Sequence, residues 1–138
     1  MTSLGIDYGD KRIGLAITDE LEIISSPLKT IPNDGKTIGE IRQIITERKV
    51  DTVVVGMPLN MDGTLGLAAR KSQEFARKLK AEVAAEVKTF DERLTTVQAD
   101  RAMLMHDVSR AKRAKHRDEM AAQILLQSYV DSKKTRKA

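Results

Sequence analysis

The chain has 138 residues and a formal net charge of +4, from 24 Lys/Arg and 20 Asp/Glu, and it is long enough for one domain with its own hydrophobic core. It contains no cysteine, which excludes disulfides, thiolate zinc sites and cysteine nucleophiles and suits a reducing cytoplasm. Aromatic residues make up only 3% of the chain, which argues against an aromatic stacking platform for single strands. No apolar run could span a bilayer and the N-terminus shows no export signal, so we expect a cytoplasmic protein without membrane contact.

The first half of the chain consists of short apolar segments separated by turns. These segments predict, in order, strands at 3–8, 12–18 and 22–31, a helix at 36–49 and a strand at 52–56. Pro27 interrupts the third strand, which is therefore expected to be bent or to lie at an edge. The strand at 52–56 is wholly apolar, as expected in a sheet that is covered on both faces.

The second half alternates in the same way. It predicts a loop at 57–64, a helix at 67–81, a strand at 83–90, a helix from Thr95 to Met105, a basic connector or helix entry at 106–117, and a last helix. The residues expected on one side of the last helix are Met120, Ala121, Ile124, Leu125 and Ser128. Because three strands joined by short turns precede alternating units, we predict an α/β protein with a mixed sheet. We expect a single domain at 1–131 and a basic, flexible tail at 132–138.

Positive charge is concentrated in the second half. Residues 1–69 have a net charge of −3 and residues 70–138 a net charge of +7. This asymmetry favours a polyanionic partner. We interpret the basic run 110–117 as a nucleic-acid contact, because it directly precedes an acidic candidate, Asp118.

Asp7 is the most informative residue, because a carboxylate within an apolar strand is costly to bury without a partner. Asp91 and Glu92 follow the apolar strand that ends at Phe90, and Asp118 stands at the predicted start of the last helix. Ligands of α/β sheets gather beyond strand ends, so these acids could converge on Asp7. Neighbouring strand residues face opposite ways, so only one of Asp91 and Glu92 is expected to face the site, and we favour Glu92.

A cluster of carboxylates needs cations, and Mg²⁺ is the natural choice. Two such ions can support phosphodiester cleavage. Each acid alone is more often a cap or a salt-bridge partner, and carboxylates such as Asp118 also favour helix N-termini. His106 and His116 are the only histidines, which gives little support to a zinc site or a Ser-His-Asp triad.

Four motifs in order resemble the YqgF family, also described as RuvX, of Holliday-junction-resolvase-like nucleases. They cover nearly the whole chain and are found at 5–16 (beginning Gly5-Ile6-Asp7-Tyr8-Gly9), 56–64, 90–96 and 118–129. The resemblance implies a ribonuclease H-like fold, with a five-stranded mixed β-sheet flanked by α-helices. It also implies a metal-dependent nuclease site at Asp7, Glu92 and Asp118, with Mg²⁺, or Mn²⁺ as a substitute.

The resemblance further implies cytoplasmic work on structured RNA, namely processing of the 5′ end of pre-16S ribosomal RNA in ribosome biogenesis. Resolution of branched DNA, the four-way Holliday junction, is an alternative, and symmetric cutting there would call for a homodimer rather than a monomer. Four basic residues are predicted to contact phosphates without reading sequence: Arg12, Arg93, Lys112 and Lys115.

Two other classes of function stay open from the sequence. The chain could be a non-catalytic module that binds RNA or pre-ribosomal particles through 110–117. Alternatively, its opening hairpin is also found at the phosphate-binding start of actin-like ATPases and sugar kinases. Those enzymes need two such lobes, and 138 residues supply one.

Overall fold

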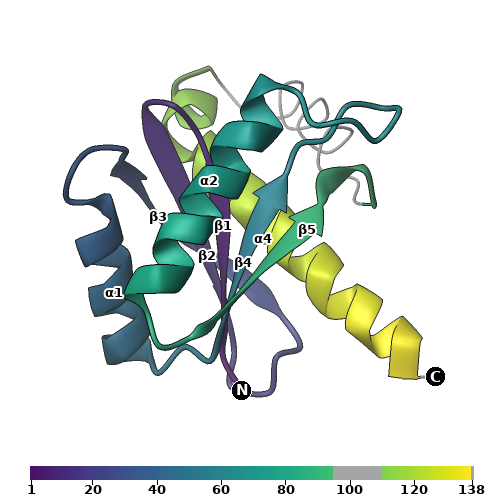
Figure 1. Cartoon of the computed structure of the whole chain (residues 1–138). Helices are drawn as coiled ribbons and strands as arrows, with labels where there is room; N and C mark the ends of the chain where they lie inside the picture. The colour runs from purple at the N-terminus through teal and green to yellow at the C-terminus, as the bar shows by residue number, and fades with distance from the viewer. Residues whose placement is uncertain (95–109, 138) are drawn as a thin grey trace.

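The computed structural model describes residues 1–94 and 110–137, and Figure 1 shows their arrangement. The elements are β1 (Ser3–Tyr8), β2 (Arg12–Thr18), β3 (Ser25–Pro32), α1 (Thr37–Arg48), β4 (Thr52–Met57), α2 (Leu67–Glu82), β5 (Glu86–Asp91), the 3₁₀ turn η1 (Glu92–Leu94) and α4 (Arg110–Lys137). The predicted helix from Thr95 to Met105, and His106 after it, lie outside the described residues.

The five strands form one mixed sheet in the order β3-β2-β1-β4-β5. β1 and β3 both pair with β2 in antiparallel fashion, whereas β4 is parallel to β1 and to β5. The mixed sheet and the edge position of the Pro27 strand are therefore as predicted. Because β1, β4 and β5 run in the same direction, their carboxyl ends share one end of the sheet, where the predicted acids also lie.

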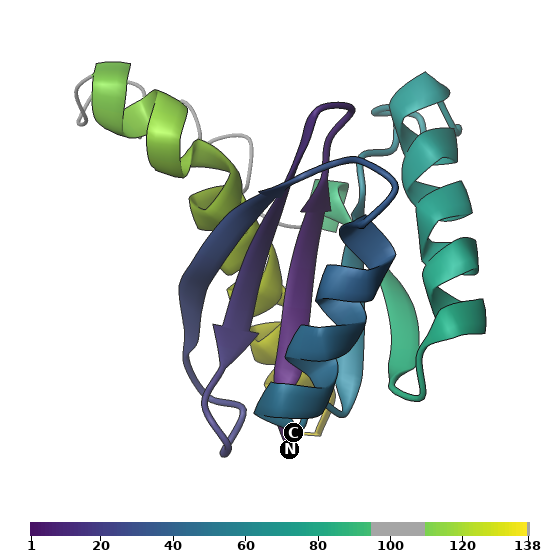
Figure 2. The same ribbon diagram turned by 90° about the vertical axis from the view of Figure 1, so that its left-hand side faces the viewer.

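Helices cover both faces of the sheet. α1 and α2 pack on one face and α4 on the other, and Figure 2 shows α4 beginning at the end that carries the β1–β2 turn. The side chains of β1 alternate accordingly: Leu4 and Ile6 join the core beneath α1 and α2, and Gly5 faces Leu126 of α4. Asp7 is two residues beyond Gly5 and shares its face. The fold thus turns Asp7 towards α4.

Three glycines on adjacent strands let α4 lie close to the sheet. A Cβ added to Gly14 of β2 would collide with the carbonyl oxygen of Asp118, and one on Gly5 of β1 would lie 2.8 Å from Cβ of Leu126. A Cβ on Gly56 of β4 would lie 2.9 Å from Cδ2 of Leu125. A helix cannot approach a sheet this closely over larger residues, so these glycines set the distance between α4 and the strands.

Two strands begin three residues later than predicted, whereas β3, β4 and β5 each end one residue later. β3 begins at Ser25 rather than residue 22, because the Asp19 carboxylate accepts hydrogen bonds from the amides of Ile23 and Ile24 and closes a turn there. β5 begins at Glu86 rather than residue 83, because the amide of Val83 still bonds the carbonyl of Leu79 at the end of α2.

The last helix also differs from the prediction. It begins at Arg110, so Asp118 lies about two turns inside α4 and not at its start. The buried residues of α4 are Ala121, Ala122, Leu125, Leu126, Tyr129 and Val130. The expected stripe was therefore displaced by about one residue, because the close contact at the glycines decides which side of the helix meets the sheet. α4 runs on to Lys137; the division between a domain at 1–131 and a tail at 132–138 stays a prediction.

Candidate active site

Asp7 occupies the centre of the candidate site. It pairs with Gly14 of β2, and cross-strand partners share a face of the sheet. On its other side, Ile6 pairs with Val55, so Gly56 of β4 is the next residue alongside Asp7. The Asp7 side chain is half-buried. It therefore lies between two glycines that leave the space beside it to other side chains.

Asp118 lies on the β2 side of Asp7. Its backbone rests directly on Gly14, the strand partner of Asp7. The Asp118 side chain is 21% exposed, and its Oδ2 accepts a hydrogen bond from Nε of Arg12 at 3.0 Å. The contact between α4 and Gly14 therefore fixes the backbone of Asp118 next to Asp7, while its carboxylate is bound to the cation of Arg12.

Glu92 lies on the β4 side of Asp7. Its Oε1 would be 3.1 Å from a Cβ on Gly56, so the side chain fills the space that this glycine leaves. Glu92 is the first residue of η1, where the chain turns at the end of β5. The turn directs Glu92 back over β4, so Asp7, Glu92 and Asp118 gather on one face at the carboxyl ends of β1 and β4.

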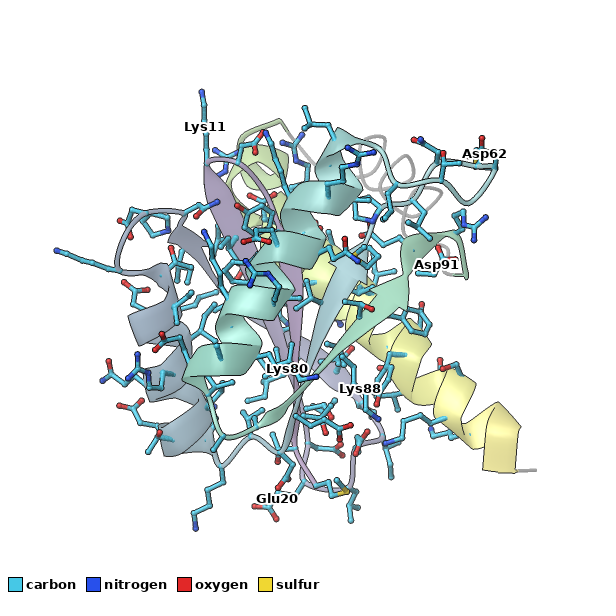
Figure 3. All side chains as sticks on the ribbon, viewed as in Figure 1. Lys11, Glu20, Asp62, Lys80, Lys88 and Asp91 are labelled. Atoms are coloured by element: carbon cyan, nitrogen blue, oxygen red, sulfur yellow. The ribbon has the colours of Figure 1, made fainter. Side chains whose placement is uncertain are left out.

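Asp91 has a different environment. Both of its carboxylate oxygens bond Arg93, with the shortest contact 2.7 Å from Nη2, and the amide of Arg93 donates to Oδ1. This hydrogen bonding holds the pKa of Asp91 below its usual value. Arg93 also donates to the carbonyl of Met61 at 3.3 Å. Asp91 and Arg93 thus join the end of β5 to the loop at 57–64, and Figure 3 shows Asp91 and Asp62 at the same end of the molecule.

The loop at 57–64 is held in one shape by its own polar groups. The amide of Asn60 bonds the carbonyl of Thr64, and the amide and hydroxyl of Thr64 both bond the carboxylate of Asp62. The Thr64 hydroxyl holds the pKa of Asp62 below its usual value. Gly63 adopts φ +88°, with the Arg93 guanidinium beside it. The loop is therefore a fixed rim at the β4 side of the site.

The four residues predicted to contact phosphates lie in different surroundings. Arg12 lies beside the carboxylates, at Asp118, whereas Arg93 is engaged with Asp91 and Met61. Lys112 and Lys115 belong to the first turns of α4, and their side chains lie outside the described part of the structure. Their role in binding phosphate stays a prediction.

The donor set suits a hard divalent cation, because three carboxylates supply only oxygen ligands. Within residues 1–94 and 110–137, however, no three Asp, Glu, His or Cys side chains stand in an arrangement that could hold a metal ion. The side chains that could supply ligands to such a cation are Asp7, Glu92 and Asp118.

Local sequence pattern did not place Gly14 and Gly56 beside the carboxylates. Both are glycines within predicted strands or at a strand end, and glycine there marks a close approach of another group. That signal was present at both positions. What approaches each glycine depends on the tertiary structure, which brings Asp118 to one and Glu92 to the other.

Solved structures with the same arrangement of elements define the class of fold. Thermus thermophilus RuvC in complex with a Holliday junction substrate matches with a TM-score of 0.61 and 15% identity, over 97% of this chain and 96% of that one. The fowlpox virus Holliday junction resolvase matches with a TM-score of 0.53 and 16% identity, over 96% and 99%. At such identities the likeness concerns the fold, and it confirms the predicted ribonuclease H-like fold.

Sequence relatives define the family within this class. A Geobacillus kaustophilus protein named "Putative pre-16S rRNA nuclease" is 47% identical over 138 residues, which cover 97% of this chain and all of that protein. A Clostridium botulinum protein of the same name is 46% identical over 134 residues, covering 96% and 98%. The family model described as "RuvX: Holliday junction resolvase" matches residues 1–132. The chain belongs to the RuvX family, which confirms the resemblance seen in its sequence and its assignment to a family of nucleases.

No helix in the described ranges is both long and apolar enough to cross a membrane.

Proposed function

We propose that this protein is a Mg²⁺-dependent nuclease that hydrolyses phosphodiester bonds at the 5′ end of pre-16S ribosomal RNA in the cytoplasm. The observation that carries the proposal is the convergence of Asp7, Glu92 and Asp118 around Gly14 and Gly56. The three carboxylates and two glycines come from four separate parts of the chain and meet on one face of the sheet. The name of the relatives supports the choice of RNA substrate.

Each carboxylate has a role that follows from its position. Asp7 is central and is held by the β1 ladder, so it would anchor the bound cation, with Asp118 and Glu92 completing the set on either side. Bound Mg²⁺ would supply charge compensation for the attacking and leaving oxygens of an in-line displacement. Arg12 at the Asp118 side would orient the phosphate backbone.

The critical variant is Asp7→Asn, which keeps the shape of Asp7 and removes its charge. We expect turnover of a precursor ribosomal RNA fragment with Mg²⁺ to fall on the order of 100-fold or more, while binding of the same RNA is retained. Cleavage is followed on gels and binding by fluorescence anisotropy. Asp10→Asn is the matched control, since Asp10 is an exposed carboxylate in the adjacent turn that pairs only with Lys71 within the described residues, and it should cleave like the wild type.

A four-way DNA junction tested in parallel, with Mg²⁺ and with Mn²⁺, addresses the family description. Cleavage of the junction but not of the RNA would replace the proposed substrate by branched DNA. Equal cleavage by the wild type and Asp7→Asn would rule out the proposed site. It would assign the cleavage to a contaminating nuclease and favour a non-catalytic binding module.

A further inference from the structure

Arg12 and Asp118 form an ion pair across the candidate site. They are 106 residues apart in sequence, and Nε of Arg12 lies 3.0 Å from Oδ2 of Asp118. The Arg12 side chain is 53% exposed and that of Asp118 21% exposed. Arg12 is therefore the more exposed partner, and a cation or a phosphate can reach the pair from solvent.

The two partners differ in how firmly they are held. The backbone of Asp118 is fixed by its contact with Gly14, and Arg12 is two residues before Gly14 on the same face of β2. Within the described residues, the Arg12 side chain makes a single hydrogen bond, through Nε. Arg93, in contrast, bonds both oxygens of Asp91 and a carbonyl of the neighbouring loop. Arg12 can thus leave its carboxylate far more easily than Arg93 can.

We infer that Arg12 is a positioning residue that holds the Asp118 carboxylate in place of a divalent cation, and that Arg12 and the cation compete for Asp118. Arg12 then turns to the substrate phosphate when Asp118 is taken by the cation. An exposed Arg–carboxylate pair contributes little free energy, so the exchange costs little. A guanidinium also binds phosphate well because its donors match the phosphate oxygens. The inference rests on the proposed function, since it concerns the same carboxylates.

Competition predicts opposite effects on two ligands. Removing Arg12 should strengthen cation binding, because Asp118 loses its competitor, and should weaken nucleic-acid binding, because a phosphate contact is lost. A residue with a purely structural role would weaken both. If Arg12 acted only through its positive charge, removing a neighbouring cation would have the same two effects. Lys11 supplies that comparison. Lys11 is exposed at the adjacent turn, and its side chain points away from the molecule (Figure 3).

The first experiment titrates Mn²⁺ into the wild type, Arg12→Ala, Arg12→Lys and Lys11→Ala by isothermal titration calorimetry, without nucleic acid. Arg12→Ala should bind Mn²⁺ about two- to fivefold more tightly than Lys11→Ala, the range that an exposed ion pair allows. Arg12→Lys should lie between Arg12→Ala and the wild type. Equal affinities of Arg12→Ala and Lys11→Ala would overturn the competition.

The second experiment needs no metal and is done in EDTA. Asp118→Asn releases Arg12, so it should raise the affinity for a precursor ribosomal RNA fragment in the wild-type background and in Lys11→Ala, but much less in Arg12→Ala. Such coupling is read from a double-mutant cycle. An equal gain in all three backgrounds would overturn the inference. Failure of the proposed function looks different: Mn²⁺ affinity would then be the same in the wild type and Asp7→Asn, while the cycle in EDTA would still decide the role of Arg12.

Discussion

Asp91 and Glu92 are neighbours in sequence that the fold assigns to different surroundings. Asp91 ends β5 and is bound by Arg93, whereas Glu92 begins η1 and turns towards Gly56. Alternation along a strand predicts that only one of them faces the site, and this part could be read from the sequence. The partner of Asp91 could not, because a salt bridge with Arg93 depends on the exact turn of η1.

The ion pair between Asp91 and Arg93 predicts a pH-dependent contribution to the free energy of unfolding. The Arg93 hydrogen bonds lower the pKa of Asp91 in the folded protein, and the unfolded value is about 3.9. The stabilisation is therefore fully present above about pH 4 and is lost as the pH falls through the lowered pKa of the folded state. Asp91→Asn should reduce the free energy of unfolding by about 1 kcal/mol at pH 7, and this difference from the wild type should shrink below pH 4.

Urea denaturation between pH 7 and pH 3 measures this difference. Glu86→Gln is the matched control on the same strand, because its contact with Lys88 is long, at 3.8 Å, and exposed. It should change stability by less than about 0.5 kcal/mol across the range. A constant difference between Asp91→Asn and the wild type down to pH 3 would contradict the lowered pKa.

At the scale of elements, the contact between α4 and the glycines of the sheet places the site. The strands and helices before residue 94 follow from apolar periodicity, and the sequence predicts nearly all of them. The start of α4 escaped prediction because 110–117 has no apolar period. Its content of Ala, Lys and Arg, which are strong helix formers, is the local signal that favours a helix there. The convergence of Asp7 with Glu92 required the strand order β1-β4-β5, which local pattern does not specify.

Gly14→Ala tests whether this contact positions Asp118. The new Cβ would collide with the Asp118 backbone, so α4 must shift. We expect a loss of about 1–3 kcal/mol in the free energy of unfolding and a loss of turnover in the molecules that remain folded. Thermal unfolding and cleavage assays are the measurements.

Gly39→Ala is the control on the opposite face. Gly39 lies in α1, and a Cβ there would meet nothing within 4 Å. Alanine should leave turnover unchanged and stabilise the protein by up to about 1 kcal/mol, because it favours the helix. Turnover at the wild-type level in Gly14→Ala would show that the close contact is not required for the site.

At the scale of the whole molecule, the candidate site lies apart from a hollow between α1 and α2. That hollow has a volume of about 380 Å³ and is lined in part by Tyr8, Arg70 and Phe75, on the far face of the sheet from α4. Neither Asp7, Glu92 nor Asp118 lines it. The carboxylates lie instead beside α4, whose first turns carry the basic run, and this arrangement suits a long polyanion better than a small ligand.

Charge reversal in the basic run tests this arrangement. Lys112→Glu and Lys115→Glu should each weaken RNA binding and reduce the slope of log affinity against log salt by about 1, as expected for loss of a phosphate contact. Lys80→Glu makes the same change in net charge at the far end of α2 and should leave the slope nearly unchanged. Anisotropy titrations at several salt concentrations give the slopes. Three equal slopes would assign the effect to net charge alone.

The close contact of α4 with Gly5, Gly14 and Gly56 suggests a way to inhibit the protein. One of the three carboxylates belongs to the helix and two belong to the sheet side, so the constellation exists only while the two are in register. A ligand or partner that inserts between α4 and the sheet would separate Asp118 from Asp7 and Glu92. It would abolish the arrangement without contacting an acidic side chain. The contact between α4 and the three glycines is therefore a second place at which the protein could be inhibited, and it is far less polar than the site itself.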